Sequence, residues 1–147
     1  MNAMIRPARL TDGPALQRNC YPDEMVADVS DYLAWCLRQT DKGWIVRLIA
    51  EVDAEAVGNV QLTVCGAVGE IGSLVVAPAY RGHGLSRWLL AEVIWAGREH
   101  GLAALEIDFA GDRPALGEFY ARMGFKKKKE LPLDPSARPL IRLRMDL

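Results

Sequence analysis

Two glycines in a short turn are the residues whose type and spacing say most about chemistry. An apolar run of the β type ends at Pro78, and the turn Arg81-Gly82-His83-Gly84 then leads into an amphipathic segment. A turn of this kind exposes backbone N–H groups, because glycine has no Cβ, and the first N–H groups of a helix lack partners within it. These donors and the positive end of the helix macrodipole favour a phosphate group. The pattern predicts a nucleotide-like ligand held by the backbone.

A second block, Phe119-Tyr120-x-x-x-Gly124-Phe125, lies downstream of this turn. With both blocks in this order, the chain resembles the Gcn5-related N-acetyltransferase (GNAT) family. The cofactor motif of that family is Arg or Gln, two residues, Gly, one residue, then Gly or Ala. Arg81, Gly84 and Ser86 occupy the three places, and Ser86 departs from the pattern by adding a hydroxyl within reach of a phosphate oxygen. The resemblance covers residues 45–147 well and residues 1–44 in outline.

The resemblance implies an N-acyltransferase that takes acetyl-CoA as cosubstrate and uses no metal. It further implies direct attack of an amine on the thioester in a ternary complex, without a covalent enzyme intermediate. The pantetheine arm is expected to lie along the strand edge that ends at Val76, whose N–H is expected to polarise the thioester carbonyl. The cofactor-binding residues expected from the motif are Leu74, Val75, Val76, Arg81, Gly82, His83, Gly84, Leu85, Ser86 and Arg87.

Tyr120 is the residue expected to protonate the departing CoA thiolate, because it occupies the tyrosine place of the family's second block. An unperturbed tyrosine has a pKa of about 10, so its hydroxyl keeps its proton at neutral pH. The alternative is a structural role. Leu116, Phe119, Tyr120 and Met123 recur at helical spacing, which is equally typical of a core stripe.

The base that deprotonates the amine is left open between two carboxylates and a water chain. Glu70 aligns with a glutamate that serves as base in some members of the family, and Asp108 occupies a place used by others. On strand alternation Asp108 shares a face with Glu106, opposite Leu105 and Ile107. Each carboxylate is also typical of an exposed strand end.

The acceptor is expected to be a small-molecule or peptide amine, bound between the first helical pair and the last hairpin. The first region carries Tyr21, Asp23 and Glu24, an acidic segment with one aromatic residue. We therefore hypothesise a cationic amine recognised partly by Asp23 and Glu24. The same residues also fit a solvated helix N-terminus, where acidic side chains are favoured by the dipole.

The elements that must position these groups follow from periodicity and from turn residues. The pattern predicts one α+β domain over residues 1–147, with a mixed sheet of about seven strands flanked by four helices in the order β-αα-βββ-α-β-α-ββ. The expected strands are 4–9, 44–52, 56–64, 70–77, 105–109, 125–131 and 140–147. The expected helices begin near residues 12, 28, 85 and 115, and a turn with Pro132, Pro135 and Pro139 separates the last two strands.

Composition narrows the expected partners and location. The formal net charge is −1, which gives no electrostatic reason to expect nucleic acid, and no segment is apolar enough to predict a membrane span. Cys20, Cys36 and Cys65 are far apart and form no Cys-x-x-Cys pair, which is typical of reduced thiols in a cytoplasmic protein. A homodimer is compatible with these features.

Two other functions compete with an acyltransferase. A dinucleotide-binding module of the Rossmann type would need a third glycine, yet Arg87 follows Gly84 at the corresponding place, and three strands precede the strand that leads into this turn. A catalytically silent acyl-CoA sensor or scaffold of the same fold would keep the turn and lose turnover. The presence of Tyr120 argues against the sensor.

Overall fold

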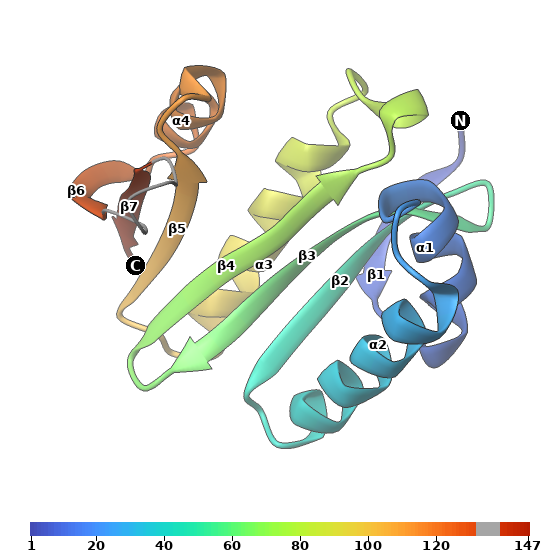
Figure 1. The fold of residues 1–147 in the computed structure, drawn as a ribbon. Helices are drawn as coiled ribbons and strands as arrows, with labels where there is room; N and C mark the ends of the chain where they lie inside the picture. Colours follow the sequence, from blue (N-terminus) through green and yellow to red (C-terminus); the bar gives the residue numbers. More distant parts are fainter. Residues whose placement is uncertain (132–138) are drawn as a thin grey trace.

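A twisted seven-stranded sheet runs through the molecule and carries helices on both faces (Figure 1). The computed structural model describes residues 1–131 and 139–147. In chain order the elements are β1 (Ala3–Pro7), the 3-10 helix η1 (Leu10–Asp12), α1 (Gly13–Cys20), α2 (Val26–Asp41), β2 (Ile45–Val52), β3 (Glu55–Cys65), β4 (Val68–Val76), the 3-10 helix η2 (Pro78–Tyr80), α3 (Leu85–Glu99), β5 (Ala104–Ala110), α4 (Pro114–Arg122), β6 (Lys126–Leu131) and β7 (Leu140–Asp146). This confirms the predicted α+β fold, its order and its strand number.

The predicted boundaries are correct to within about two residues at most ends. β4 begins at Val68, two residues before the expected start, because the alternation continues through Gly69. The expected proline turn lies mostly outside the described residues, with Pro132 and Pro135 in the segment 132–138. Pro139 is described, and it directly precedes β7.

The sheet has the strand order β1-β2-β3-β4-β5-β7-β6, and β4 and β5 are its one parallel pair. That ladder joins Val68–Ile71 to Ala104–Ile107. Beyond Ile71, β4 continues to Val76, and within the described residues it is paired there with β3 alone. The two central strands therefore separate toward their carboxyl ends, which exposes one edge of β4 (Figure 1).

β4 also carries an irregularity at the point where it leaves β5. Its register against β3 shifts between Asn59 and Gln61, and Ser73 adopts a positive φ of 54°. A non-glycine residue in this region is strained and persists only where its surroundings hold it. A bulge bends its strand and interrupts the regular pairing. The side chains of Leu74–Val76 therefore no longer follow the alternation of the first half of β4.

Strand alternation divides the core into two layers. On β2, Ile49 packs with Leu16 and Leu33 beneath α1 and α2. Ala50 faces the opposite side, in a larger cluster that includes Leu89 of α3 and side chains of α4. The helical pair α1–α2 thus covers one face of the sheet, and α3 and α4 cover the other.

α4 can approach β5 closely because residue 117 is glycine. A Cβ built on Gly117 would lie 2.6 Å from Cζ of Phe109, well inside van der Waals contact. The Phe109 ring occupies that space and meets the Tyr120 ring edge-on, with centroids 6.0 Å apart. This packing fixes the position of Tyr120 relative to the sheet.

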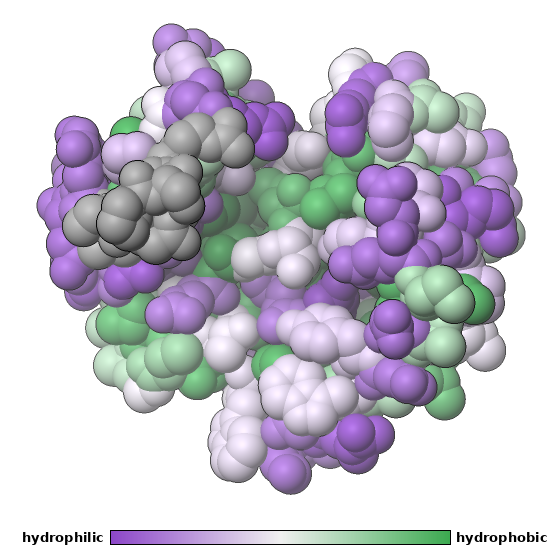
Figure 2. Space-filling view, in the orientation of Figure 1, coloured by the Kyte–Doolittle hydropathy of each residue, from purple (hydrophilic) through white to green (hydrophobic). Residues whose placement is uncertain are grey.

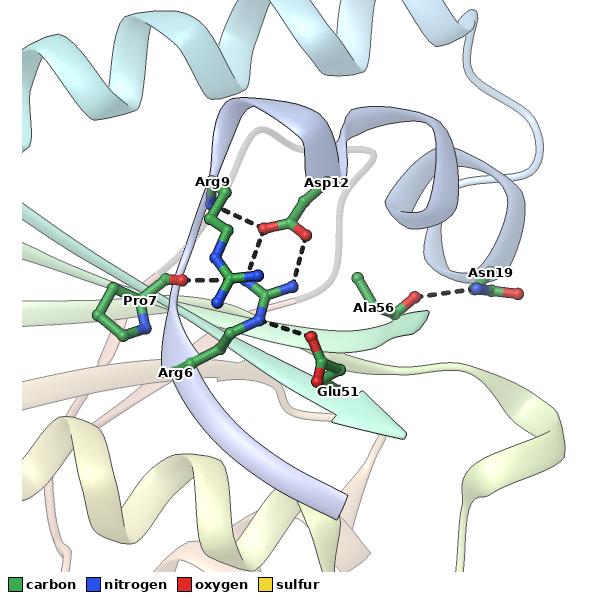
Figure 3. A network of polar contacts seen from close by, with 7 residues as sticks. All are labelled: Arg6, Pro7, Arg9, Asp12, Asn19, Glu51 and Ala56. Carbon is green, nitrogen blue, oxygen red and sulfur yellow. Dashed lines mark hydrogen bonds and ion pairs between the residues drawn. The ribbon is translucent and has the colours of Figure 1, made fainter. Parts of the chain in front are cut away.

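A buried ion-pair network fastens the start of α1 to the first two strands (Figure 3). Arg6 of β1 donates to both carboxylate oxygens of Asp12, at 2.6 and 2.9 Å, and to Glu51 of β2 at 2.8 Å. The Asp12 carboxylate also accepts the backbone N–H of Arg9. At the far end of α1, the Asn19 amide donates to the carbonyl of Ala56. Both ends of this short helix are therefore tied to the sheet.

No helix in the described part of the chain is long and apolar enough to cross a membrane. Among residues 1–131 and 139–147 there is also no group of three histidine, cysteine or acidic side chains arranged to hold a metal ion.

Candidate active site

The turn between η2 and α3 forms an open cradle of backbone groups. Gly82 and Gly84 have φ values of +84° and +80°, a conformation that favours glycine. A Cβ built on either would meet no atom within 4 Å, so the space in front of the turn is free for a ligand. The N–H of Trp88 bonds to the carbonyl of Gly84, which leaves the N–H groups of the first turn of α3 without partners in the helix. This arrangement fits the diphosphate of CoA.

The cradle is attached directly to the exposed end of β4. The Arg81 side chain folds back and donates from Nε to the carbonyl of Val76 at 3.1 Å. Val76, Phe119 and the turn itself line a small cavity of about 160 Å³. The predicted phosphate turn and the predicted pantetheine strand thus form one continuous surface.

A second cavity, the β4–α4 cleft, continues this surface between the separated strands. It has a volume of about 510 Å³ and is lined by Leu74, Ser86, Asp112, Arg113, Pro114, Ala115, Leu116, Phe119 and Tyr120. Figure 2 shows a recessed, largely apolar surface between the α4 lobe and the segment that follows β4. Such a cleft suits the long, weakly polar arm of an acyl carrier.

Tyr120 lines the β4–α4 cleft, although its side chain as a whole is only 5% exposed. Burial raises the pKa of Tyr120 above its ordinary value, and the nearby charge of Arg113 opposes this only in part. The hydroxyl therefore holds its proton at neutral pH. The ring contacts Phe109 and Phe125, so the tyrosine also belongs to the core stripe that its spacing predicts.

The two candidate bases meet where β4 and β5 separate. Glu70 and Asp108 line one small cavity together with Glu106 and Arg142. Both oxygens of Asp108 accept hydrogen bonds from Arg142, at 2.8 and 3.0 Å, and this pairing raises the pKa of Arg142. Glu70 is exposed and lies opposite Glu106 in the parallel ladder. The structure thus places both carboxylates in one cavity, and Asp108 is the one that forms an ion pair with Arg142.

A fourth cavity lies beneath α2, and we call it the α2 cavity. Its volume is about 600 Å³, and it is lined by Leu16, Tyr21, Asp23, Glu24, Met25, Asp28, Val29, Tyr32, Leu33, Arg47 and Ser73. The predicted acidic segment, with Asp23 and Glu24, therefore borders a real cavity. Ser73 lines this cavity and its neighbour Leu74 lines the β4–α4 cleft, so consecutive residues at the bulge of β4 border the two spaces.

The floor of the α2 cavity holds a polar network that the sequence reasoning missed. Arg47 on β2 donates to Gln61 at 2.5 Å and also to Asn59, both on β3. Asn59 in turn donates to the Tyr21 hydroxyl at 3.1 Å and to the Ser73 carbonyl at 3.0 Å. A signal for it was present, because Arg47 occupies an inward position between two apolar residues, Val46 and Leu48, of a mostly apolar strand.

Cys20 is unsuited to act as an acyl-carrying nucleophile at neutral pH. Burial raises the pKa of its thiol to about 11, although Arg47, a backbone hydrogen bond at Ala77 and Arg81 all act in the opposite direction. The thiolate is the reactive form of cysteine, and it is scarce at such a pKa. This agrees with the expectation of direct transfer.

Comparison with known proteins identifies the family of this arrangement. The model of the acetyltransferase (GNAT) family matches residues 9–125. The fold is that of ribosomal-protein-alanine N-acetyltransferase from Brucella melitensis, with a TM-score of 0.83 and 24% identity over 98% of this chain and 99% of that one. It is also that of yncA from Salmonella typhimurium, solved with acetyl-CoA, with a TM-score of 0.83 and 20% identity over 100% and 95% of the two chains.

A curated relative is similar over part of its length. An uncharacterized N-acetyltransferase of Methanocaldococcus jannaschii is 27% identical over 106 residues, which cover 67% of this chain and 45% of the relative. The chain thus spans less than half the length of the curated relative it matches.

Proposed function

The chain belongs to the GNAT family of acetyltransferases, and from this premise we propose that it transfers an acetyl group from acetyl-CoA to a primary amine. The proposed reaction is a direct attack within a ternary complex. The amine nitrogen forms a bond to the acetyl carbon, the bond from that carbon to the CoA sulfur breaks, and the thiolate leaves as a thiol after protonation.

One observation carries this proposal: the phosphate cradle, the exposed edge of β4 and the β4–α4 cleft form a single continuous surface. The cradle at Gly82–Gly84 offers backbone donors to a diphosphate. From there, Val76 and then Leu74 lead to the cleft that Tyr120 lines. A ligand with a phosphate at one end and an acyl thioester at the other matches this order.

Tyr120 is proposed to supply the proton that the thiolate takes. Its raised pKa keeps the hydroxyl protonated, and it lies on the wall of the cleft where the thioester is expected. For the base we propose Glu70, with Asp108 as the alternative. Both oxygens of Asp108 are engaged by Arg142, whereas no ion pair engages Glu70 among the described residues. The proton removed from the amine passes to that base directly or through water.

The three cysteines form no disulfide, which supports a reducing, cytoplasmic location as part of this proposal. The acceptor is proposed to enter through the α2 cavity, because consecutive residues, Ser73 and Leu74, line that cavity and the cleft.

The test combines binding with turnover. Calorimetric titration with acetyl-CoA should give a one-to-one complex, and a thiol-release assay should give turnover with at least one member of a panel of polyamines, aminoglycosides, amino acids and peptides. Binding without turnover across the panel would favour the acyl-CoA sensor. Absence of acetyl-CoA binding to the folded protein would reject both.

A further inference from the structure

A buried arginine in the α2 cavity has no acidic partner among residues 1–131 and 139–147. The Arg47 side chain is only 6% exposed, and no carboxylate lies within ion-pair distance of it in the described part of the chain. A buried charge is costly unless it is paired. Arg47 therefore differs from Arg6, the other buried arginine, which is neutralised by Asp12 and Glu51.

The hydrogen bonds of Arg47 do not use all of its N–H donors. A guanidinium has five N–H donors. The two Nη groups donate to the neutral amide oxygens of Gln61 and Asn59, while Nε is buried without a partner among the described residues. The Tyr32 ring lies against the guanidinium, 5.5 Å from centroid to Cζ, and adds a weak cation–π contact. The guanidinium charge therefore stays without a carboxylate partner among the described residues, and Arg47 lines the α2 cavity, where a ligand can meet that charge.

The surroundings of Arg47 indicate what that ligand looks like. Leu16, Val29 and Leu33 give the α2 cavity an apolar wall, and Asp23 and Glu24 stand on its acidic side. The cavity thus combines a cation, an apolar surface and carboxylates in about 600 Å³, which is ample for one small molecule.

We propose that Arg47 binds a carboxylate of the acceptor, and that the acceptor is an amino-carboxylic acid with an apolar side chain. The inference rests on the function proposed above, because it specifies the substrate of that same site. The carboxylate is placed at Arg47, the side chain against the apolar wall, and the amine toward Ser73 and the β4–α4 cleft. Arginine is well suited to this role, since its planar fork matches the geometry of a carboxylate.

The decisive comparison uses matched pairs of acceptors that differ only in the carboxylate. Leucine, methionine and phenylalanine are each compared with their C-terminal amides in the thiol-release assay. The amides have the less basic amine, so at equal pH more of it is unprotonated and the chemistry favours them. A preference of about tenfold or more in kcat/KM for the acids therefore reports recognition of the carboxylate.

Substitution of Arg47 assigns that preference to one side chain. Arg47→Gln should lower kcat/KM for the acids far more than for the amides and so abolish the acid-over-amide preference, while Arg47→Lys should retain part of it. Arg38→Gln, an exposed arginine in the last turn of α2, is the matched control and should behave as wild type.

The outcomes separate this inference from the proposed function. Turnover of peptides or amides in preference to the free acids overturns the inference and keeps the acyltransferase. An equal loss with acids and amides in Arg47→Gln also overturns it, because it would show a purely structural role. If no amine is turned over, calorimetric titration of the CoA complex with leucine and leucinamide still decides: tighter binding of leucine supports the carboxylate site, and equal or absent binding overturns it.

Discussion

Tyr120 shows how a single residue can serve packing and chemistry together. Its ring lies among Phe109, Phe119 and Phe125, and the residue also lines the β4–α4 cleft. The aromatic contacts hold the ring in one position, and the same burial raises the pKa of the hydroxyl. The core stripe and the proton donor that the sequence left as alternatives are therefore compatible.

Tyr120→Phe should separate the two roles. The ring and its contacts remain, so the melting behaviour and the affinity for acetyl-CoA should stay close to wild type. Loss of a general acid costs about 10²–10⁴ in rate, and the fall should appear in kcat. Steady-state kinetics and calorimetry check both parts. A kcat retained within about threefold would mean that water or another side chain delivers the proton.

The pH dependence of kcat tests the role of Tyr120 as proton donor independently. Burial raises the pKa of Tyr120 above its ordinary value of about 10. The hydroxyl should therefore stay protonated below that pH, and kcat should not decline there because of its ionisation. A kcat that declined with an apparent pKa near 8 would point to a different proton donor.

At the scale of the element, the turn into α3 depends on glycine for its backbone and for the space before it. The helix offers a matched comparison, because Gly101 follows its other end with a φ of +69° and also has open space around it. A side chain at either position meets the same conformational strain. Only at Gly84 would the side chain also project into the phosphate cradle.

Gly84→Val should therefore weaken acetyl-CoA binding by at least about tenfold, a loss of about 1.4 kcal/mol. Gly101→Val should lower the stability to a similar degree and leave acetyl-CoA affinity unchanged. Calorimetric titration of both variants, with denaturation curves alongside, makes the comparison. Equal affinities in the two variants would remove the turn as the phosphate site.

The elements were predictable from sequence to a greater degree than the acceptor cavity. Hydrophobic periodicity and turn residues are local, so they locate β4, α3 and the turn between them. The ion pair of Asp108 with Arg142 and the network around Arg47 join residues that lie far apart in the chain. Such contacts depend on strand register, which is set by tertiary packing, and at the bulge the positive φ falls on Ser73 and not on its neighbour Gly72, so the residue types do not locate the strained position.

At the scale of the whole molecule, the buried Arg6–Asp12 pair and the exposed Arg18–Glu55 pair make a natural contrast. The side chains of the first pair are each 7% exposed, and those of the second are 60% and 41% exposed. Breaking a buried pair leaves an unpaired charge out of water, whereas exposed charges stay solvated.

Asp12→Asn should lower the free energy of unfolding by about 3 kcal/mol, at the lower end of the range for a buried pair, because Glu51 continues to neutralise Arg6. Glu55→Gln is the matched control and should change stability too little to resolve. Urea denaturation of both variants measures the difference. Equal stabilities would mean that α1 is held to the sheet by its apolar contacts alone.

The short ladder between β4 and β5 has a consequence for how the protein responds to its surroundings. Four residue pairs join the first four strands to the last three, so the sheet is almost two sheets with a seam between them. A molecule seated along that seam would act as a temporary eighth strand, and it would be absent from the unfolded chain. At a hundredfold excess over its dissociation constant it would add about 2.7 kcal/mol of stability. The melting temperature of this protein would then rise with the concentration of any ligand that binds along the seam.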